Sequence, residues 1–176
     1  MTVKLTTPIT RDAARGLNAG DRVLISGTIY TARDAAHKRL LEELSEGKKP
    51  PMELENLTIY YAGPAPAKPG QVIGSCGPTT SGRMDAYAPT LISMGQTAMI
   101  GKGERSAEVI DAMKKYGAVY FGAIGGAGAL IAKSITSAEV IAYDDLGAEA
   151  IRSLTVSDFP AIVVIDSNGA SLYDRH

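Results

Sequence analysis

Residues 97–122 read TAMIGKGERSAEVIDAMKKYGAVYFG, and their pattern points to an α/β fold. Thr97–Gly101 and Ala118–Gly122 are short apolar runs, which predicts two buried strands. Between them, Ser106 can cap a helix that extends to about Tyr116. A strand, a helix and a further strand in this order are typical of a parallel sheet covered by helices.

The same alternation continues toward the C-terminus. Strands are predicted at Val140–Tyr143 and at Ala161–Asp166, with a helix near Leu146–Leu154 between them. A helix of small residues is predicted at Gly125–Lys133. This half of the chain therefore indicates an α/β core.

The first half contains more strands and fewer crossovers. Strands are predicted at Arg22–Gly27, Leu57–Tyr61 and Gln71–Gly74, and a helix at Thr31–Leu44 with Thr31 as its N-cap. We therefore expect one α/β domain over residues 1–176, built on a mixed, mostly parallel sheet.

Composition narrows the classes of function. The 176 residues are 45% apolar and 21% charged, which is ordinary for a globular protein. A net charge of −1 lacks the basic footprint of a nucleic-acid-binding protein. No apolar run approaches the roughly 20 residues of a membrane span, and the N-terminus lacks the apolar core of a signal peptide. We expect a cytoplasmic protein with neither nucleic acid nor membrane as a partner.

A single cysteine, Cys76, limits the metal chemistry of the chain. An iron–sulfur cluster needs three or four thiolates, so another chain would have to hold any cluster that the chemistry uses. We expect no metal site in this chain, and we interpret Cys76 as a small loop residue.

Residues 74–83, GSCGPTTSGR, have the composition of an anion-binding loop. They lead from a predicted strand through small residues into a predicted helix start, which would direct N–H groups and the positive end of the helix dipole at an anion. The hydroxyls of Thr79 and Thr80 add donors, and Arg83 suits bidentate binding of a carboxylate. A capped helix with a surface arginine fits the same pattern equally well.

Two other strand ends carry cations. Arg33 lies in the first turn of a predicted helix, four residues before His37, where a cation opposes the helix dipole and needs an acidic partner or ligand. Lys102 follows a predicted strand directly, at the place where open α/β sheets bind ligands. Solvated charges and a locally bonded histidine are the alternatives. Together, two arginines and a lysine with hydroxyls between them suit a substrate with two carboxylates.

Four motifs in this order resemble the β region of class I fumarases, the iron–sulfur hydro-lyases of the tartrate/fumarate group. They are GTIYTARDAAH (27–37), GPTTSGRMD (77–85), GKGERS (101–106) and SAEVIAY (137–143). The resemblance covers almost the whole chain and implies a swivelling β/β/α domain, which is a separate β subunit in two-subunit enzymes. The implied α subunit carries a [4Fe–4S] cluster on three cysteines and joins the β subunit in a heterodimer or an α2β2 complex.

The resemblance also implies a reaction and a set of roles. The reaction is the reversible hydration of fumarate to (S)-malate, with one iron of the cluster as Lewis acid. Thr79 would accept the proton at the reacting carbon, although a threonine hydroxyl is a poor base and needs an activating neighbour from the α subunit. The residues matched to dicarboxylate binding are Arg33, Thr80, Arg83 and Lys102. The supporting candidates are Asp34, His37 and Gly77.

Three alternatives share these motifs or this fold. The chain also resembles the β subunits of L-tartrate dehydratase and of mesaconate hydratase, and a non-catalytic anion-binding module would keep the same loops. Cys76 departs from the small residue usual at its position in the family. On this interpretation it would make the enzyme more sensitive to oxidants.

Overall fold

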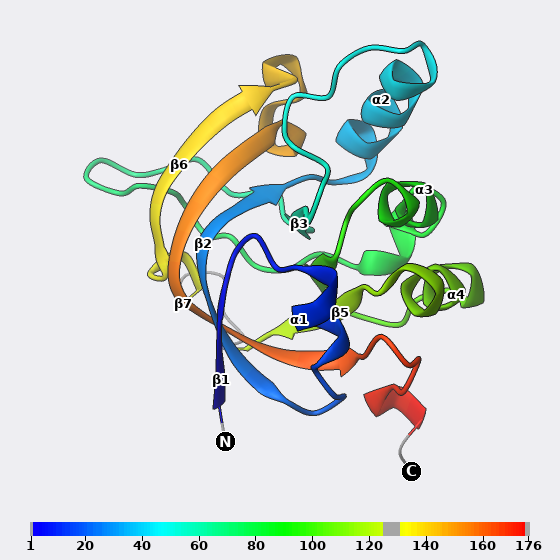
Figure 1. Cartoon of the computed structure of the whole chain (residues 1–176). Coiled ribbons are helices and arrows are strands. Elements are labelled where there is room, and N and C mark those ends of the chain that lie inside the picture. Colours follow the sequence, from blue (N-terminus) through cyan, green and yellow to red (C-terminus); the bar gives the residue numbers. More distant parts are fainter. Residues whose placement is uncertain (1, 125–130, 175–176) are drawn as a thin grey trace.

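A mixed β-sheet organises the computed structural model of the chain, which describes residues 2–124 and 131–174 (Figure 1). Within these residues the strand order is β1-β2-β3-β4-β5-β7-β6. The strands are β1 (Thr2–Thr6), β2 (Arg22–Thr31), β3 (Thr58–Tyr60), β4 (Ala98–Gly101), β5 (Val119–Ala123), β6 (Ile135–Ala142) and β7 (Ile151–Ile165). The predicted strands at 97–101 and 118–122 are confirmed as β4 and β5.

The strand directions confirm an α/β fold with a mixed sheet. Neighbours from β1 to β5 pair in parallel, whereas β7 runs antiparallel to β2, β5 and β6. Because β7 pairs with both β2 and β5, the sheet closes on itself through β2, β3, β4, β5 and β7. The helices at 34–45, 88–93 and 107–116 pack against its outer side.

Both faces of the central strands are buried, which explains their continuous apolar sequences. In β4, Ile100 belongs to the cluster inside the closed sheet, together with Phe121 of β5 and Phe159 of β7. The intervening residues Met99 and Tyr120 belong to a second cluster, against the helices. Alternate residues of one strand therefore serve two cores.

The helices at 34–45, 88–93 and 107–116 lie on one side of the sheet in Figure 1, whereas Ala14 of the short helix at 11–15 belongs to the cluster inside the closed sheet. The described helical segments are α1 (Arg11–Arg15), α2 (Asp34–Ser45), η1 (Ser81–Met84), α3 (Ala88–Ser93), α4 (Ala107–Tyr116), η2 (Asp144–Glu149) and η3 (Leu172–Asp174). The predicted start of α4 is confirmed, because the Ser106 hydroxyl accepts a hydrogen bond from the Val109 amide at 3.4 Å. No helix in residues 2–124 and 131–174 is long and apolar enough to cross a bilayer.

The predicted N-cap of α2 is wrong. Thr31 is the last residue of β2 and pairs with Tyr60 of β3 and Arg152 of β7. Its hydroxyl accepts a hydrogen bond from the Arg152 amide at 3.3 Å, so it is used in the sheet. The helix begins at Asp34, with Arg33 in the N-cap position.

Two other predicted elements differ from the structure. Residues 71–74 form no strand, and the helix expected near 146–154 is replaced by η2 and the start of β7. Leu154 and Val156 are buried while Thr155 is exposed, which is the two-residue period of a strand. The predicted helix at 125–133 falls mainly on residues 125–130, outside the described residues.

Candidate active site

A hollow of about 240 Å³ lies at the carboxyl ends of the parallel strands. Arg33 comes two residues after β2, and Lys102 follows β4 directly. The segment 78–83 joins them from the long connection after β3. The lining residues are Arg33, Pro78, Thr79, Thr80, Arg83 and Lys102. The structure thus brings together the catalytic candidate and the four substrate-binding candidates that the sequence indicated.

Short backbone pairings hold Thr79 and Thr80 against Lys102. Thr80 forms a parallel bridge with Lys102, and the Ser81 amide donates to the Lys102 carbonyl at 2.8 Å. The amide of Thr79 donates to the Tyr61 carbonyl at 2.8 Å, and its hydroxyl donates to the same oxygen at 3.0 Å. The hydroxyl proton of Thr79 is therefore engaged, while its oxygen lone pairs stay available as acceptors.

Close packing beneath the loop requires a glycine at position 101. A Cβ atom on Gly101 would lie 2.0 Å from the Ser81 hydroxyl oxygen and 2.9 Å from a ring carbon of Tyr61. The glycine therefore lets the loop approach the end of β4.

The expected helix dipole at this loop is wrong. Only the four-residue 3₁₀ turn η1 follows Thr80, and α3 begins later, at Ala88. The amides of Thr79 and Ser81 donate to protein carbonyls and so are not offered to an anion. The positive character of the hollow comes from its side chains, Arg33, Arg83 and Lys102.

His37 lies behind Arg33 and is fully buried. Its Nδ1 lies 2.8 Å from the Arg33 carbonyl oxygen, so Nδ1 carries the proton and donates it. Burial lowers the pKa of His37 to about 4, and the ring is therefore neutral near pH 7. Its Nε2 has no hydrogen-bond partner among the described residues. His37 does not line the hollow, and its geometry is that of a support for Arg33.

The remaining supporting candidates lie at the edges of the hollow. Asp34 Oδ2 is 3.9 Å from Arg83 Nη1, and both side chains are partly exposed. Gly77 is half-buried and precedes Pro78, where the lining begins. Asp34 is thus a neighbour of Arg83, and Gly77 belongs to the approach to the loop.

Cys76 is buried, and burial raises the pKa of its thiol to about 12. Because the thiolate is the reactive form, burial and the raised pKa argue against the expected sensitivity of this thiol to oxidants. No group of three or more His, Cys, Asp or Glu side chains suited to a metal occurs in residues 2–124 and 131–174. The donors of the described chain therefore do not fit an iron–sulfur cluster.

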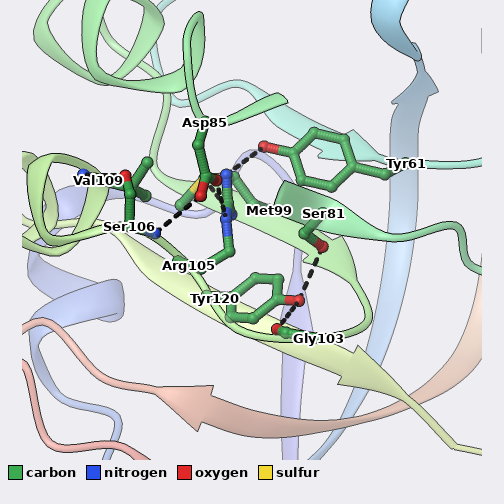
Figure 2. Close-up of polar contacts among 9 residues, drawn as sticks. All are labelled: Tyr61, Ser81, Asp85, Met99, Gly103, Arg105, Ser106, Val109 and Tyr120. Atoms are coloured by element: carbon green, nitrogen blue, oxygen red, sulfur yellow. Dashed lines mark hydrogen bonds and ion pairs between the residues drawn. The ribbon is translucent and has the colours of Figure 1, made fainter. Parts of the chain in front are cut away.

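Figure 2 shows a cluster of buried polar side chains next to the segments that line the hollow. The sequence alone indicated no role for this cluster. Arg105 Nε donates to Asp85 Oδ1 at 2.7 Å, and its Nη2 donates to the Tyr61 hydroxyl at 3.2 Å. The Tyr120 hydroxyl donates to the Gly103 carbonyl at 2.8 Å. Burial raises the pKa of both tyrosines, so both hydroxyls are protonated at neutral pH. The available signal was a charged residue close to the end of each motif, Asp85 as the last residue of 77–85 and Arg105 as the last but one of 101–106.

Comparison with known proteins adds independent information. The family described as "Fumarase C-terminus" matches residues 1–176. A Leishmania major protein named fumarate hydratase 2 is 43% identical over 158 residues, which are 89% of this chain and 28% of that protein. The aerobic class I fumarate hydratase of Escherichia coli (strain K12) is 44% identical over 156 residues, again 28% of its length. A Methanocaldococcus jannaschii protein assigned as an L(+)-tartrate dehydratase subunit beta is 39% identical over 173 residues, which are 95% of this chain and 89% of that protein.

Proposed function

The chain belongs to the fumarase C-terminus family, and on that premise we propose that it is the β subunit of a two-subunit iron–sulfur fumarate hydratase. In this proposal it contributes the dicarboxylate-binding half of an active site that hydrates fumarate reversibly to (S)-malate. The observation that carries the proposal is the hollow at the strand ends. Arg33, Arg83 and Lys102 line it with two threonine hydroxyls, and no carboxylate occurs among its described lining residues.

The hollow supplies charges of the kind that a dicarboxylate needs. Arg33 and Arg83 carry planar guanidinium groups that can each bind a carboxylate with two parallel hydrogen bonds, whereas Lys102 acts as a point charge. The Thr80 hydroxyl adds a neutral donor. Arg83 contacts Asp34 only weakly, at 3.9 Å, so a substrate carboxylate would replace Asp34 as the partner of Arg83. His37 would hold Arg33 in place, because its Nδ1 donates a hydrogen bond to the Arg33 carbonyl oxygen.

Thr79 is the proposed proton acceptor, and its hydrogen bond to Tyr61 indicates that a further acid-base group is required. Its hydroxyl proton points to the Tyr61 carbonyl at 3.0 Å, and a carbonyl oxygen cannot take that proton away. A neutral hydroxyl is a poor base, so an acid-base group of the α subunit must complete the site. In the assembled enzyme, Thr79→Ala should reduce kcat at least about a hundredfold, and Thr79→Ser should keep most of it. Turnover of the alanine variant near the wild-type rate would reject Thr79 as the base.

The proposal extends to the assembly. The [4Fe–4S] cluster belongs to the α subunit, and the two chains form a heterodimer or an α2β2 complex in the cytoplasm. Residues 1–176 would act as one swivelling β/β/α domain. The relative in Methanocaldococcus jannaschii supports a separate chain, because this chain covers 89% of a protein assigned as a subunit beta.

The same relative supports a second candidate, the β subunit of an L-tartrate dehydratase. This chain covers nearly all of that protein but only 28% of each of the two fumarate hydratases above. Tartrate also carries two carboxylates, so the cationic hollow suits it as well. Mesaconate hydratase has the same charge requirement.

Anaerobic reconstitution with a cluster-bearing α subunit tests the proposal. The complex is assayed with fumarate, L-tartrate and mesaconate, and the isolated chain serves as the control. We expect an inactive isolated chain and a complex with its highest kcat/KM for fumarate. Preference for tartrate or mesaconate would select the corresponding alternative. Dicarboxylate binding by the isolated chain, without activity in the complex, would indicate a non-catalytic module.

A further inference from the structure

Asp85 and Arg105 connect the two segments that carry the hollow. Asp85 follows the segment of Thr79 and Arg83, and Arg105 comes three residues after Lys102. Neither residue is among the described lining of the hollow, and the side chain of Arg105 is 0% exposed. We propose that they form a positioning pair, which fixes Thr79 and Arg83 relative to Lys102. This inference rests on the proposed function for its effect on turnover.

The Asp85 carboxylate uses both oxygens to join the two segments. Oδ1 accepts from Arg105 Nε at 2.7 Å, and Oδ2 accepts from the Ser106 amide at 2.7 Å. Ser106 is the N-cap of α4, whose residues Val109 and Met113 are buried in the core against the sheet. The end of η1 is thereby attached to a helix with a fixed place in the core.

The Arg105 guanidinium extends this connection to Thr79. Its central carbon lies 5.2 Å from the ring centroid of Tyr61 and 4.9 Å from that of Tyr120. Nη2 also donates to the Tyr61 hydroxyl at 3.2 Å, and the carbonyl of Tyr61 accepts both the amide and the hydroxyl of Thr79. A displaced Arg105 would therefore disturb the residue that holds Thr79.

Tyr120 connects the two segments a second time. Because its hydroxyl donates to the Gly103 carbonyl at 2.8 Å, it accepts from the Ser81 hydroxyl at 2.7 Å. Gly103 follows Lys102, and Ser81 follows Thr80, so this bridge runs parallel to the ion pair. Figure 2 shows both connections converging on the same buried region.

Stability alone is a weak reason for a buried ion pair at this place. The cost of removing two charges from water often cancels their attraction, and apolar replacements are frequently as stable. Directional bonds instead fix a register between two segments, which an apolar contact does less well. Here the two segments carry the proposed base and a substrate-binding cation.

Amide hydrogen exchange in the full chain tests the positioning directly. Asp85→Asn should speed exchange of the Ser81 and Lys102 amides at least about tenfold, because both donate across the two segments. The matched control is Asp145→Asn, which removes the exposed pair with Arg39. Wild-type exchange rates at Ser81 and Lys102 in Asp85→Asn would overturn the proposal.

Kinetics of the reconstituted complex provide the second readout. Asp85→Asn should lower kcat for fumarate at least about tenfold, since small misplacements of reacting groups are costly, and KM should change less than about threefold because the lining cations remain. Arg105→Lys keeps the charge and should lose less of kcat. If Asp85→Asn does not fold, Arg105→Lys carries both measurements. A kcat equal to that of Asp145→Asn would overturn the proposal.

The two readouts separate this proposal from the proposed function. If the wild-type complex turns over none of fumarate, L-tartrate and mesaconate, the proposed function and its two hydro-lyase alternatives fail. The exchange rates of the Ser81 and Lys102 amides then still decide whether Asp85 and Arg105 fix the two segments.

Discussion

Two arginine–aspartate pairs flank the hollow and differ in burial. Arg105 Nε and Asp85 Oδ1 are 2.7 Å apart, and the side chains are 0% and 17% exposed. Arg83 Nη1 and Asp34 Oδ2 are 3.9 Å apart, and the side chains are 65% and 41% exposed. A deeply buried charge depends on its partner, whereas an exposed pair interacts weakly and can exchange its partner for a ligand. The buried pair of Arg105 and Asp85 is therefore suited to holding segments of the site in place, whereas the exposed pair of Arg83 and Asp34 leaves the Arg83 cation available to a ligand.

Removing the buried partner should have the largest effect on stability. Asp85→Ala leaves the Arg105 charge in a site where its side chain is 0% exposed. We expect the free energy of unfolding to fall by about 3–5 kcal/mol, the usual cost of an uncompensated buried charge. Urea unfolding of the full chain, followed by circular dichroism, measures this change. A loss below about 1 kcal/mol would mean that water or another group replaces Asp85.

Lowering the pH should destabilise the folded chain through His37, which lies in α2. Its pKa falls from 6.5 in the unfolded chain to about 4 in the folded chain, mainly because the ring is buried. Between these pH values the unfolded chain binds a proton that the folded chain does not, so stability decreases as pH falls from about 6.5 to about 4 and is unaffected by His37 above that range. The total loss should be about 3 kcal/mol.

The contribution of His37 is isolated by comparison with His37→Asn. Asparagine can still donate a hydrogen bond near the Nδ1 position but does not titrate in this range. The difference in the free energy of unfolding between the two proteins should therefore vary with pH only between about 4 and 6.5. A difference that is constant with pH would show that His37 is protonated as readily in the folded chain as in the unfolded one.

Two glycines near the pairs should respond differently to a methyl group. In Gly101→Ala the added Cβ meets the Ser81 hydroxyl oxygen at 2.0 Å, and in Gly82→Ala it meets nothing within 4 Å. Ser81 would have to leave Tyr120, so Gly101→Ala should cost about 1–3 kcal/mol of stability. Gly82→Ala should change stability by less than about 0.5 kcal/mol. Equal effects in urea unfolding would contradict the tight approach of the loop to β4.

The sequence predicts the parts of the fold that depend on local pattern. Apolar runs identify β4 and β5 because both faces of these strands are buried, and the Ser106 cap defines the start of α4. The extent of β7 could not be predicted, because residues such as Leu154 fit a helix pattern as well as a strand. Only pairing with β2, β5 and β6, which is a tertiary property, decides between them.

The candidate site divides in the same way. The cations Arg33 and Lys102 can be found from sequence because they follow strand ends, where ligands bind in open α/β sheets. The ion pair of Asp85 with Arg105 could not be found, because the residues lie 20 positions apart and meet only when two loops fold together. The dipole expectation failed for a local reason, since η1 has only four residues.

Removing the exposed partner should have a much smaller effect than removing the buried one. Asp34→Ala deletes a carboxylate that is 41% exposed and 3.9 Å from Arg83, so solvent screens most of the interaction. We expect the free energy of unfolding to change by less than about 1 kcal/mol, with a further decrease in this small effect at high salt.

Double-mutant cycles provide the sharpest contrast between the two pairs. The coupling energy of Asp34 with Arg83 should be near zero, and that of Asp85 with Arg105 should exceed about 1.5 kcal/mol. Similar coupling energies would contradict the distinction between the two pairs. Arg83 would then be bound to Asp34 as strongly as Arg105 is to Asp85, and it would not be free to bind a ligand.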